Sequence, residues 1–194
     1  MDKISYALGL SIGHNFKSSG IKEIILPDFY QALEDVVNDR TPQLSFDEAK
    51  VIINEYFMGL QKEQGELNIK AGEEFLKINK EREGVVCLES GLQYQIINEG
   101  SGSKPTADDQ VECHYEGALI NGKIFDSSIQ RGEPAIFGIT QVIAGWTEAL
   151  QLMSEGSKWR LFIPSSLAYG TQQAGELIEP NSCLVFEVEL LKIV

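Results

Sequence analysis

The sequence has few of the residues from which metal sites and disulfide frameworks are built. It contains three cysteines and two histidines among 194 residues, and Cys87, Cys113 and Cys183 lie far apart in the chain. An odd number of widely spaced cysteines does not predict a disulfide framework, and a zinc ion needs three or four ligands. We therefore expect no metal and no other cofactor, and we expect Cys113 and Cys183 to be small buried apolar side chains.

Basic residues are scarce as well. The chain has 16 Lys and Arg against 29 Asp and Glu, a net charge of −13. Nucleic-acid binding requires neutralisation of phosphates by Lys and Arg, and anionic membrane surfaces attract the same residues. We therefore expect neither nucleic acid nor a membrane as a partner, and we interpret the acidity as a solubilising surface charge.

Long apolar runs are absent. No stretch is long enough to span a bilayer, and the first residues, Met1-Asp-Lys-Ile-Ser-Tyr6, lack the apolar region of a signal peptide. The expected location is cytoplasmic if Met1 is the natural start. The alternative is a periplasmic protein from which a leader has been removed.

Residues 1–44 have a helical pattern and are predicted to form an N-terminal helical module. Ile4, Leu8 and Ile12 are four apart, and Pro27 suits the first turn of a second helix. A long connecting helix is predicted over residues 45–84. Ser45 and Glu48 form a capping box at its start.

The two halves of this long helix differ in sequence. The first half is strongly apolar, whereas the second has charged residues around a thin apolar line of Leu67, Ala71, Phe75 and Ile78. A helix this polar is expected to be an exposed rod between two bodies, weakened at Gly59, Gly65 and Gly72. The apolar surplus of residues 1–60 predicts a homodimer through the N-terminal helices, with a monomeric three-helix bundle as the alternative.

After Gly84 the apolar period changes from helical to two. Strands are predicted over 92–97, 111–118, 158–163 and 184–191, and one short helix over 145–153. Asn121-Gly122 predicts a type I′ hairpin turn. One short helix on a curved antiparallel sheet is an α+β fold, assigned to residues 85–194.

Aromatic or branched apolar residues stand beside a Gly or a single polar group where these strands end, a pattern that predicts a shallow apolar pocket. The series resembles the FKBP-type peptidyl-prolyl cis-trans isomerases; it comprises Tyr115, Phe125-Asp126, Arg131, Val142-Ile143, Gly145-Trp146, Tyr169-Gly170 and Phe186. Residues 5–13 and 70–75 look like the Mip-like (macrophage infectivity potentiator) branch. The resemblance implies a bacterial enzyme that dimerises through N-terminal helices and acts on X-Pro bonds of folding polypeptides.

The resemblance also implies a set of site residues. Those expected to be catalytic are Asp126, Tyr169, Phe125 and Trp146, and those expected to bind substrate are Tyr115, Phe137, Val142, Ile143, Ile178 and Phe186. Trp146 would be the floor of the pocket, while the Ile143 N–H and the Tyr169 hydroxyl would hold substrate carbonyls. Asp126 would point at the twisting amide and accept a hydrogen bond from Tyr115 or Arg131.

The chain departs from the family pattern at the rim, at Ala135, Gln141, Ala174 and Leu177. These departures leave open how tightly macrolide inhibitors such as tacrolimus or rapamycin bind. Without the family pattern, Asp126 would be read as a turn cap at Ser127-Ser128, and Trp146 and Phe186 as ordinary core aromatics.

Three functions from different classes follow from this sequence. The leading hypothesis is an isomerase that accelerates proline-limited folding. The second is a chaperone that holds unfolded chains in a cleft between two protomers. The third is a receptor for a small apolar ligand, which Ala135 and Gln141 disfavour.

Overall fold

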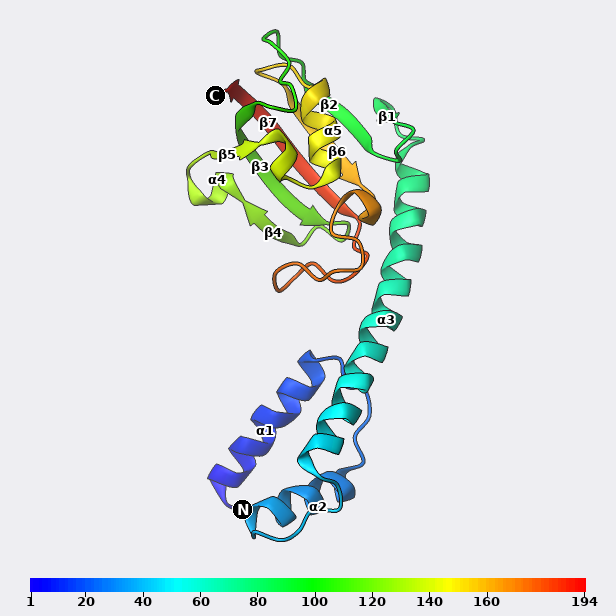
Figure 1. Cartoon of the computed structure of the whole chain (residues 1–194), viewed down its shortest axis with the longest axis vertical. Coiled ribbons are helices and arrows are strands. Elements are labelled where there is room, and N and C mark those ends of the chain that lie inside the picture. Colours follow the sequence, from blue (N-terminus) through cyan, green and yellow to red (C-terminus); the bar gives the residue numbers. More distant parts are fainter. The chain divides into compact units, whose positions relative to one another are not determined.

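The computed structural model describes residues 1–194 and contains two compact units, residues 1–60 and 61–194 (Figure 1). The α-helices are α1 (Lys3–Ser18), α2 (Leu26–Val37), α3 (Phe46–Asn79), α4 (Ser128–Arg131) and α5 (Ala144–Leu152). The strands are β1 (Val85–Cys87), β2 (Gln93–Asn98), β3 (Gln110–Leu119), β4 (Ile124–Ser127), β5 (Ala135–Gly138), β6 (Lys158–Ile163) and β7 (Leu184–Ile193). Two short 3₁₀ helices are η1 (Ile139–Gln141) and η2 (Ser165–Leu167).

Side-chain capping hydrogen bonds define where α1 and α3 begin. The Asp2 carboxylate accepts a hydrogen bond from the Ser5 N–H at 2.8 Å and caps α1. At the start of α3, the Ser45 N–H donates to Glu48 at 2.9 Å and the Glu48 N–H donates to the Ser45 hydroxyl at 3.2 Å. The predicted capping box is therefore confirmed.

Residues 1–60 have almost no interior of their own. Asp35 is the one buried residue of this unit, and an edge-to-face pair of Phe16 and Phe29 is a local contact at 5.4 Å. Large apolar side chains are exposed on all of its helices, among them Ile4, Leu8, Leu10, Tyr30, Val37, Phe46, Ile52, Ile53 and Met58. Clusters of exposed apolar side chains on a protein surface mark interaction sites.

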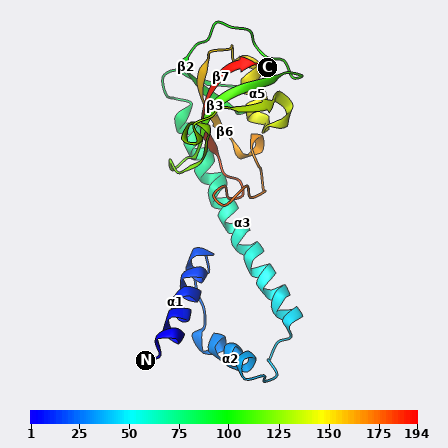
Figure 2. The same ribbon diagram turned by 90° about the vertical axis from the view of Figure 1, so that its left-hand side faces the viewer.

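The second unit is built on one antiparallel sheet. Its strand order is β1-β2-β6-β7-β3-β4, and β5 pairs with β3. Inward-facing residues of β3, β6 and β7 alternate with outward-facing ones and meet α5 in a single core that includes Trp146, Leu150 and Leu161. Figure 2 shows α5 on one side of the sheet and the end of α3 on the other. The α+β fold predicted from the sequence is confirmed.

The hairpin between β3 and β4 differs from the prediction. The Gly122 N–H donates to the Leu119 carbonyl at 2.8 Å and the Leu119 N–H donates to the Lys123 carbonyl at 2.9 Å. Gly122 has φ 85°, but Asn121 is not among the residues with positive φ, and a type I′ turn requires positive φ at both central positions. The type I′ prediction is therefore wrong: residues 120–122 form a longer loop with Gly in the left-handed position.

The C-terminal part of α3 packs on the outer face of the sheet. Its less exposed residues follow a helical spacing: Gln64, Gly65, Asn68, Gly72, Phe75, Leu76 and Asn79. A Cβ atom on Gly72 would lie 3.0 Å from the Cβ of Cys183, and the Phe75 ring lies 6.0 Å from that of Phe162. Phe162 and Cys183 are buried but lie outside the main core, because α3 covers them.

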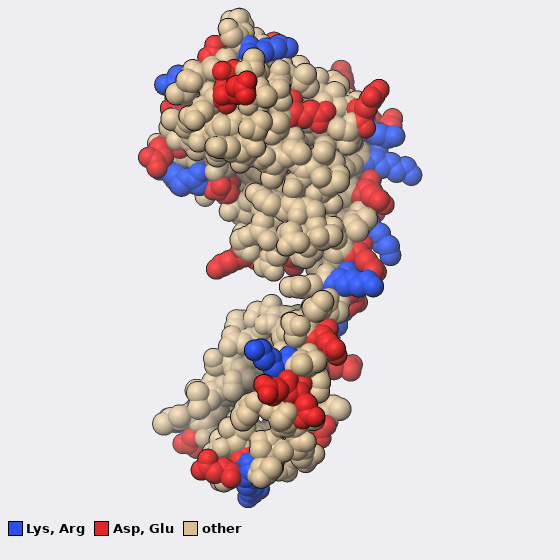
Figure 3. Space-filling view, viewed as in Figure 1, with Lys and Arg blue, Asp and Glu red and all other residues tan.

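The prediction of an exposed rod is wrong over residues 61–79. Leu67 and Ile78, from the predicted apolar line, are 53% and 56% exposed, while the contact face consists largely of Gly and Asn. Glycine permits a close approach of backbones that hydropathy does not detect. All charged residues of α3 between 61 and 79 are exposed, and charged side chains line the edge of the molecule where this part of α3 lies (Figure 3).

We predict that Gln93→Leu will destabilise the second unit. Buried Gln93 accepts from Asn79 and donates to the Leu76 carbonyl, both at 2.9 Å. Replacing the Gln93 amide leaves its buried hydrogen-bond partners unpaired. This should lower the free energy of unfolding by about 1–3 kcal/mol. Denaturant unfolding followed by tryptophan fluorescence measures this, because both tryptophans lie in residues 61–194. Gln95→Leu on the same strand is the control, and an equal loss in both variants would contradict the prediction.

Candidate active site

A cavity of about 390 Å³ opens between the sheet and the start of α5. Aromatic and branched apolar side chains line most of it, and its residues are Tyr115, Phe125, Asp126, Phe137, Gln141, Val142, Ile143, Trp146, Tyr169 and Phe186. The surface over this side of the unit is largely free of charged side chains (Figure 3). The structure thus brings together all predicted site residues except Ile178.

Trp146 is the centre of the aromatic cluster. Its ring lies edge-to-face with Tyr115 at 5.4 Å, with Phe137 at 5.5 Å and with Phe186 at 5.3 Å. Phe186 in turn packs against Phe125 at 5.5 Å. Such arrangements match the negative face of one ring with the positive edge of the next, so the side chains around the cavity support one another's orientation. Trp146 is 3% exposed.

Local sequence explains how Trp146 reaches this place. Gly145 precedes it in the first turn of α5, and a Cβ atom on Gly145 would lie 2.6 Å from the Cγ2 of Ile163 on β6. Glycine is therefore required for α5 to approach the sheet closely. This approach seats the indole at the base of the cavity.

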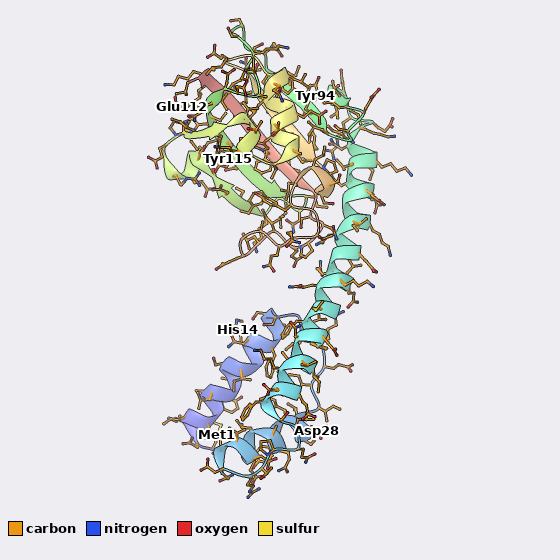
Figure 4. All side chains as sticks on the ribbon, in the orientation of Figure 1. Met1, His14, Asp28, Tyr94, Glu112 and Tyr115 are labelled. Atoms are coloured by element: carbon orange, nitrogen blue, oxygen red, sulfur yellow. The ribbon has the colours of Figure 1, made fainter.

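Asp126 is the one carboxylate in the cavity, and two donors hold it. The Tyr115 hydroxyl donates to its Oδ2 at 2.5 Å, and the Arg131 guanidinium is ion-paired with its Oδ1. Arg131 also donates to the Tyr115 hydroxyl oxygen at 2.8 Å and lies over the Tyr115 ring. Figure 4 marks Tyr115 on β3. The three side chains form a closed triangle at one wall.

This triangle shifts the proton equilibria of its members. Burial raises the pKa of the Asp126 carboxyl, but hydrogen bonds from Tyr115 and Arg131, together with the positive charge of Arg131, outweigh burial and bring that pKa below its usual value. Burial and the bond to Asp126 raise the pKa of Tyr115. At neutral pH the wall therefore holds an ionised carboxylate and a neutral phenol.

Asp126 does not occupy the N-cap position of α4, although its carboxylate also has a backbone hydrogen bond with Ser127. Ser127 is the N-cap of α4, because its hydroxyl accepts the Gln130 N–H at 3.2 Å. The buried Ser128 hydroxyl accepts the Tyr115 N–H at 2.7 Å and donates to the Tyr115 carbonyl at 3.2 Å. These two serines fix the chain on either side of the turn and leave Asp126 to point into the cavity.

Among the hydrogen-bond donors at the cavity, the Ile143 N–H, the Tyr169 hydroxyl and the buried indole N–H of Trp146 have no partner within the protein. The N–H of Ile143, at the residue before α5, donates to no other group. The hydroxyl of Tyr169, which is 40% exposed, makes no hydrogen bond either. An apolar hollow with a few unsatisfied donors at its edge is suited to a ligand that carries carbonyl groups.

Ile178 lines a second cavity of about 420 Å³, which adjoins the first and shares Phe125, Asp126 and Tyr169 with it. A bridge between Ala174 and Ile178 closes the loop at this place. Gln141 lines the first cavity but was identified from the sequence only as a departure from the family pattern. Arg131, five residues after Asp126, was named as a partner of the carboxylate, and the contact is present.

The buried cysteines are not reactive groups. Burial raises the pKa values of Cys113 and Cys183 to about 12 in each case, so both thiols are protonated at neutral pH. The prediction that they are small buried apolar side chains is confirmed.

An antiparallel sheet packed on one short helix, with an aromatic cavity between them, defines an FKBP-like domain. A family model described as FKBP-type peptidyl-prolyl cis-trans isomerase matches residues 101–191, and one described as the domain amino terminal to FKBP-type peptidyl-prolyl isomerase matches residues 1–96. The chain belongs to the FKBP-type peptidyl-prolyl cis-trans isomerase family.

Relatives match over almost the whole chain. The outer membrane protein MIP of Legionella longbeachae is 42% identical over 200 residues, covering 99% of this chain and 85% of the relative. The FKBP-type 22 kDa peptidyl-prolyl cis-trans isomerase of Escherichia coli is 42% identical over 192 residues, covering 97% and 93%. The crystal structure of FkpA from Escherichia coli has a TM-score of 0.78 at 34% identity and covers 98% of this chain and 95% of that chain. The resemblance to the Mip-like branch is confirmed, and the protein is an FKBP-type isomerase.

None of the helices combines the length and the apolar character needed to cross a bilayer. The cytoplasmic location expected from the sequence finds no support in the comparisons, because they include a relative named as an outer membrane protein.

We predict that Arg131→Leu will raise the pKa of Asp126, because the variant loses a hydrogen bond and a positive charge. A carboxyl with a depressed folded-state pKa contributes stability above its unfolded pKa of about 4, and this contribution is lost as the pH falls through the folded value. The stability that the ionised carboxylate contributes should therefore be lost at higher pH in the variant, and a carboxyl NMR titration of Asp126 measures the cause. Arg160→Leu, whose carboxylate partner is Glu187, is the control. An unchanged Asp126 titration in Arg131→Leu would refute the prediction.

Proposed function

We propose that the aromatic cavity is where this isomerase binds the X-Pro bond, and that it acts by removing water from the amide and favouring its twisted form. The observation that carries the proposal is the cavity centred on Trp146, with two unpaired donors and one fixed carboxylate at its edge. The substrate class is a polypeptide that presents proline in an extended or partly folded segment.

The reaction needs rotation and no bond cleavage. The barrier is about 18–20 kcal/mol, because the C–N bond has partial double-bond character, and the uncatalysed reaction takes tens to hundreds of seconds. Resonance places charge on the oxygen and nitrogen of the planar amide, so water stabilises the planar form more than the twisted one. An apolar cavity removes this preference and lowers the barrier.

The chain's own residues have separate roles in the proposal. Trp146 offers a flat apolar floor to the proline ring, and Phe125, Tyr115 and Phe186 form the walls. The Ile143 N–H and the Tyr169 hydroxyl hold substrate carbonyls on either side of the rotating bond. Asp126, held by Tyr115 and Arg131, faces the carbonyl carbon, whose positive character grows as resonance is lost.

The rate enhancement that the proposal requires is modest. Shortening a reaction from ~100 s to ~1 ms is a factor of about 10⁵, or roughly 7 kcal/mol. Water exclusion and selective binding of the twisted form are the two contributions available here. Both contributions depend on the shape of the cavity, and the hydrogen-bond donors and the carboxylate at its edge add to them.

We predict that Tyr169→Phe will lower kcat/KM about three- to tenfold, the value of one net hydrogen bond, and that Asp126→Asn will lower it further without loss of fold. A protease-coupled assay on a proline tetrapeptide measures both. Tyr94→Phe is the matched control, because Tyr94 lies on β2 (Figure 4) and stacks on Trp159 away from the cavity. Full activity in Asp126→Asn would remove this carboxylate from the mechanism.

The protein is further proposed to be a homodimer through residues 1–60. The exposed apolar side chains of α1, α2 and the start of α3 provide the surface for an isologous contact. A stable interface buries about 1,200–2,000 Å² in total, and a second copy of the same helices would also give this unit the interior that it lacks alone. Two cavities on one dimer would raise the effective concentration for a client with several prolines.

We predict that Ile53→Glu will convert the dimer to a monomer, because it places a charge on the apolar face of α3, where Ile53 is 55% exposed. Light scattering at micromolar concentration measures this, and Glu55→Gln is a control on the same helix. Peptide isomerisation per chain should be unchanged in the monomer. If the dimer is also a holding chaperone, the monomer should lose protection of a proline-free client against aggregation. A monomeric wild-type protein would refute the dimer.

Macrolide inhibitors are predicted to bind in the same cavity. Gln141 lines the cavity and Ala174 and Leu177 line its neighbour, so the rim differs from the pattern that such inhibitors meet in other family members. Competition of rapamycin with the tetrapeptide substrate measures the affinity directly.

A further inference from the structure

The loop between η2 and β7 carries Tyr169 and Ile178, and a tight turn forms its base. The Ser182 N–H and hydroxyl both donate to the Glu179 carbonyl, at 3.2 and 2.7 Å. Pro180 and Asn181 occupy the central positions of this turn, and Asn181 has φ 60°. Proline followed by a left-handed Asn is typical of a type II turn. The base of the loop is therefore a defined structure to which another element can attach.

The attached element is α3. The Asn68 side-chain amide donates to the Pro180 carbonyl at 2.9 Å and to the Glu179 carboxylate at 3.3 Å. Its own oxygen accepts from Gln64 at 3.1 Å, which fixes the orientation of the amide. One side chain of the helix thus bonds two successive residues of the turn.

Close packing accompanies these hydrogen bonds. A Cβ atom on Gly65 would lie 2.8 Å from the Nδ2 of Asn181 and 3.6 Å from the Cβ of Pro180. Gly65 is buried although it lies on a helix with many charged residues. The helix surface is flat at this point, and the turn rests on it.

The turn is connected directly to the cavity. The Asn181 N–H donates to the Gly170 carbonyl at 2.7 Å, and Gly170 follows Tyr169 in the chain. A series of contacts therefore connects α3, the turn at 179–182 and Gly170, the neighbour of Tyr169 at the cavity edge. All of these groups lie within the second unit.

We propose that Asn68 and Gly65 are positioning residues for the isomerase reaction: α3 holds the turn at 179–182, and the turn holds Tyr169 at the cavity. The inference rests on the proposed role of Tyr169. A residue that binds substrate equally in ground and transition states affects KM more than kcat. Loosening the loop should therefore weaken substrate binding while the Trp146 floor stays intact.

The first test is structural and uses the full-length protein. In Asn68→Ala and Gly65→Gln, amide hydrogen exchange over residues 170–183 should accelerate at least fivefold, with the β3, β6 and β7 amides unchanged. Matched controls are Lys70→Ala and Ala71→Gln, at exposed positions of the same helix. Gly65→Gln introduces a better helix former, so faster exchange in this variant would not be a result of a weaker helix. Wild-type exchange in both test variants would overturn the proposal.

The second test is kinetic. Asn68→Ala should raise KM for a proline tetrapeptide about threefold or more and change kcat less than twofold, whereas a loss of folded protein would lower the apparent kcat at constant KM. In a Tyr169→Phe background the Asn68 effect on KM should largely disappear, because the group that it positions has been removed.

The combination of outcomes separates this inference from the proposed function. If Tyr169→Phe alone has wild-type kinetics, the proposed role of Tyr169 fails, and the inference fails with it. If Tyr169→Phe is impaired but Asn68→Ala has wild-type KM, only the positioning inference fails. An equal KM effect of Asn68→Ala in both backgrounds would also overturn it.

Discussion

The approach of α5 to the sheet at Gly145 is the constraint on which the cavity depends. No side chain fits between this residue and Ile163, and the resulting contact places the indole of Trp146 among Tyr115, Phe137 and Phe186. Aromatic pairs of this kind contribute about 0.5–1.5 kcal/mol each beyond burial. The cavity is thus a continuation of the hydrophobic core.

One charged triangle stands in this apolar setting. Tyr115, Asp126 and Arg131 satisfy one another, so the carboxylate keeps its hydrogen-bond partners at the edge of an apolar cavity. The low pKa of Asp126 means that its charge is constant throughout the neutral range. An enzyme that catalyses rotation has no need for a proton donor or acceptor, and the site is consistent with that requirement.

The sequence predicted the four longest strands, the capping box and every residue of the cavity set except Gln141, while the predicted Ile178 lines the neighbouring cavity. Periodicity was sufficient for the strands because apolar residues alternate there, while the site itself came from the order of residues such as Phe125, Trp146 and Phe186 in a family pattern. The face of α3 could not be predicted in this way, because Gly65, Asn68 and Gly72 make contact through smallness and amide hydrogen bonds. The hairpin type was missed because Asn-Gly also suits a longer loop in which Gly alone is left-handed.

The face of α3 that packs on the sheet is poor in large apolar side chains, and this matters if the helix leaves the sheet. The helix face uncovered in this way consists mainly of glycine and amide groups, with Phe75 and Leu76 as its large apolar side chains. This face of the helix adds little to the exposed apolar surface that promotes aggregation. On the sheet side the same detachment would uncover Phe162 and Cys183, so the apolar area that this contact hides belongs mainly to the sheet.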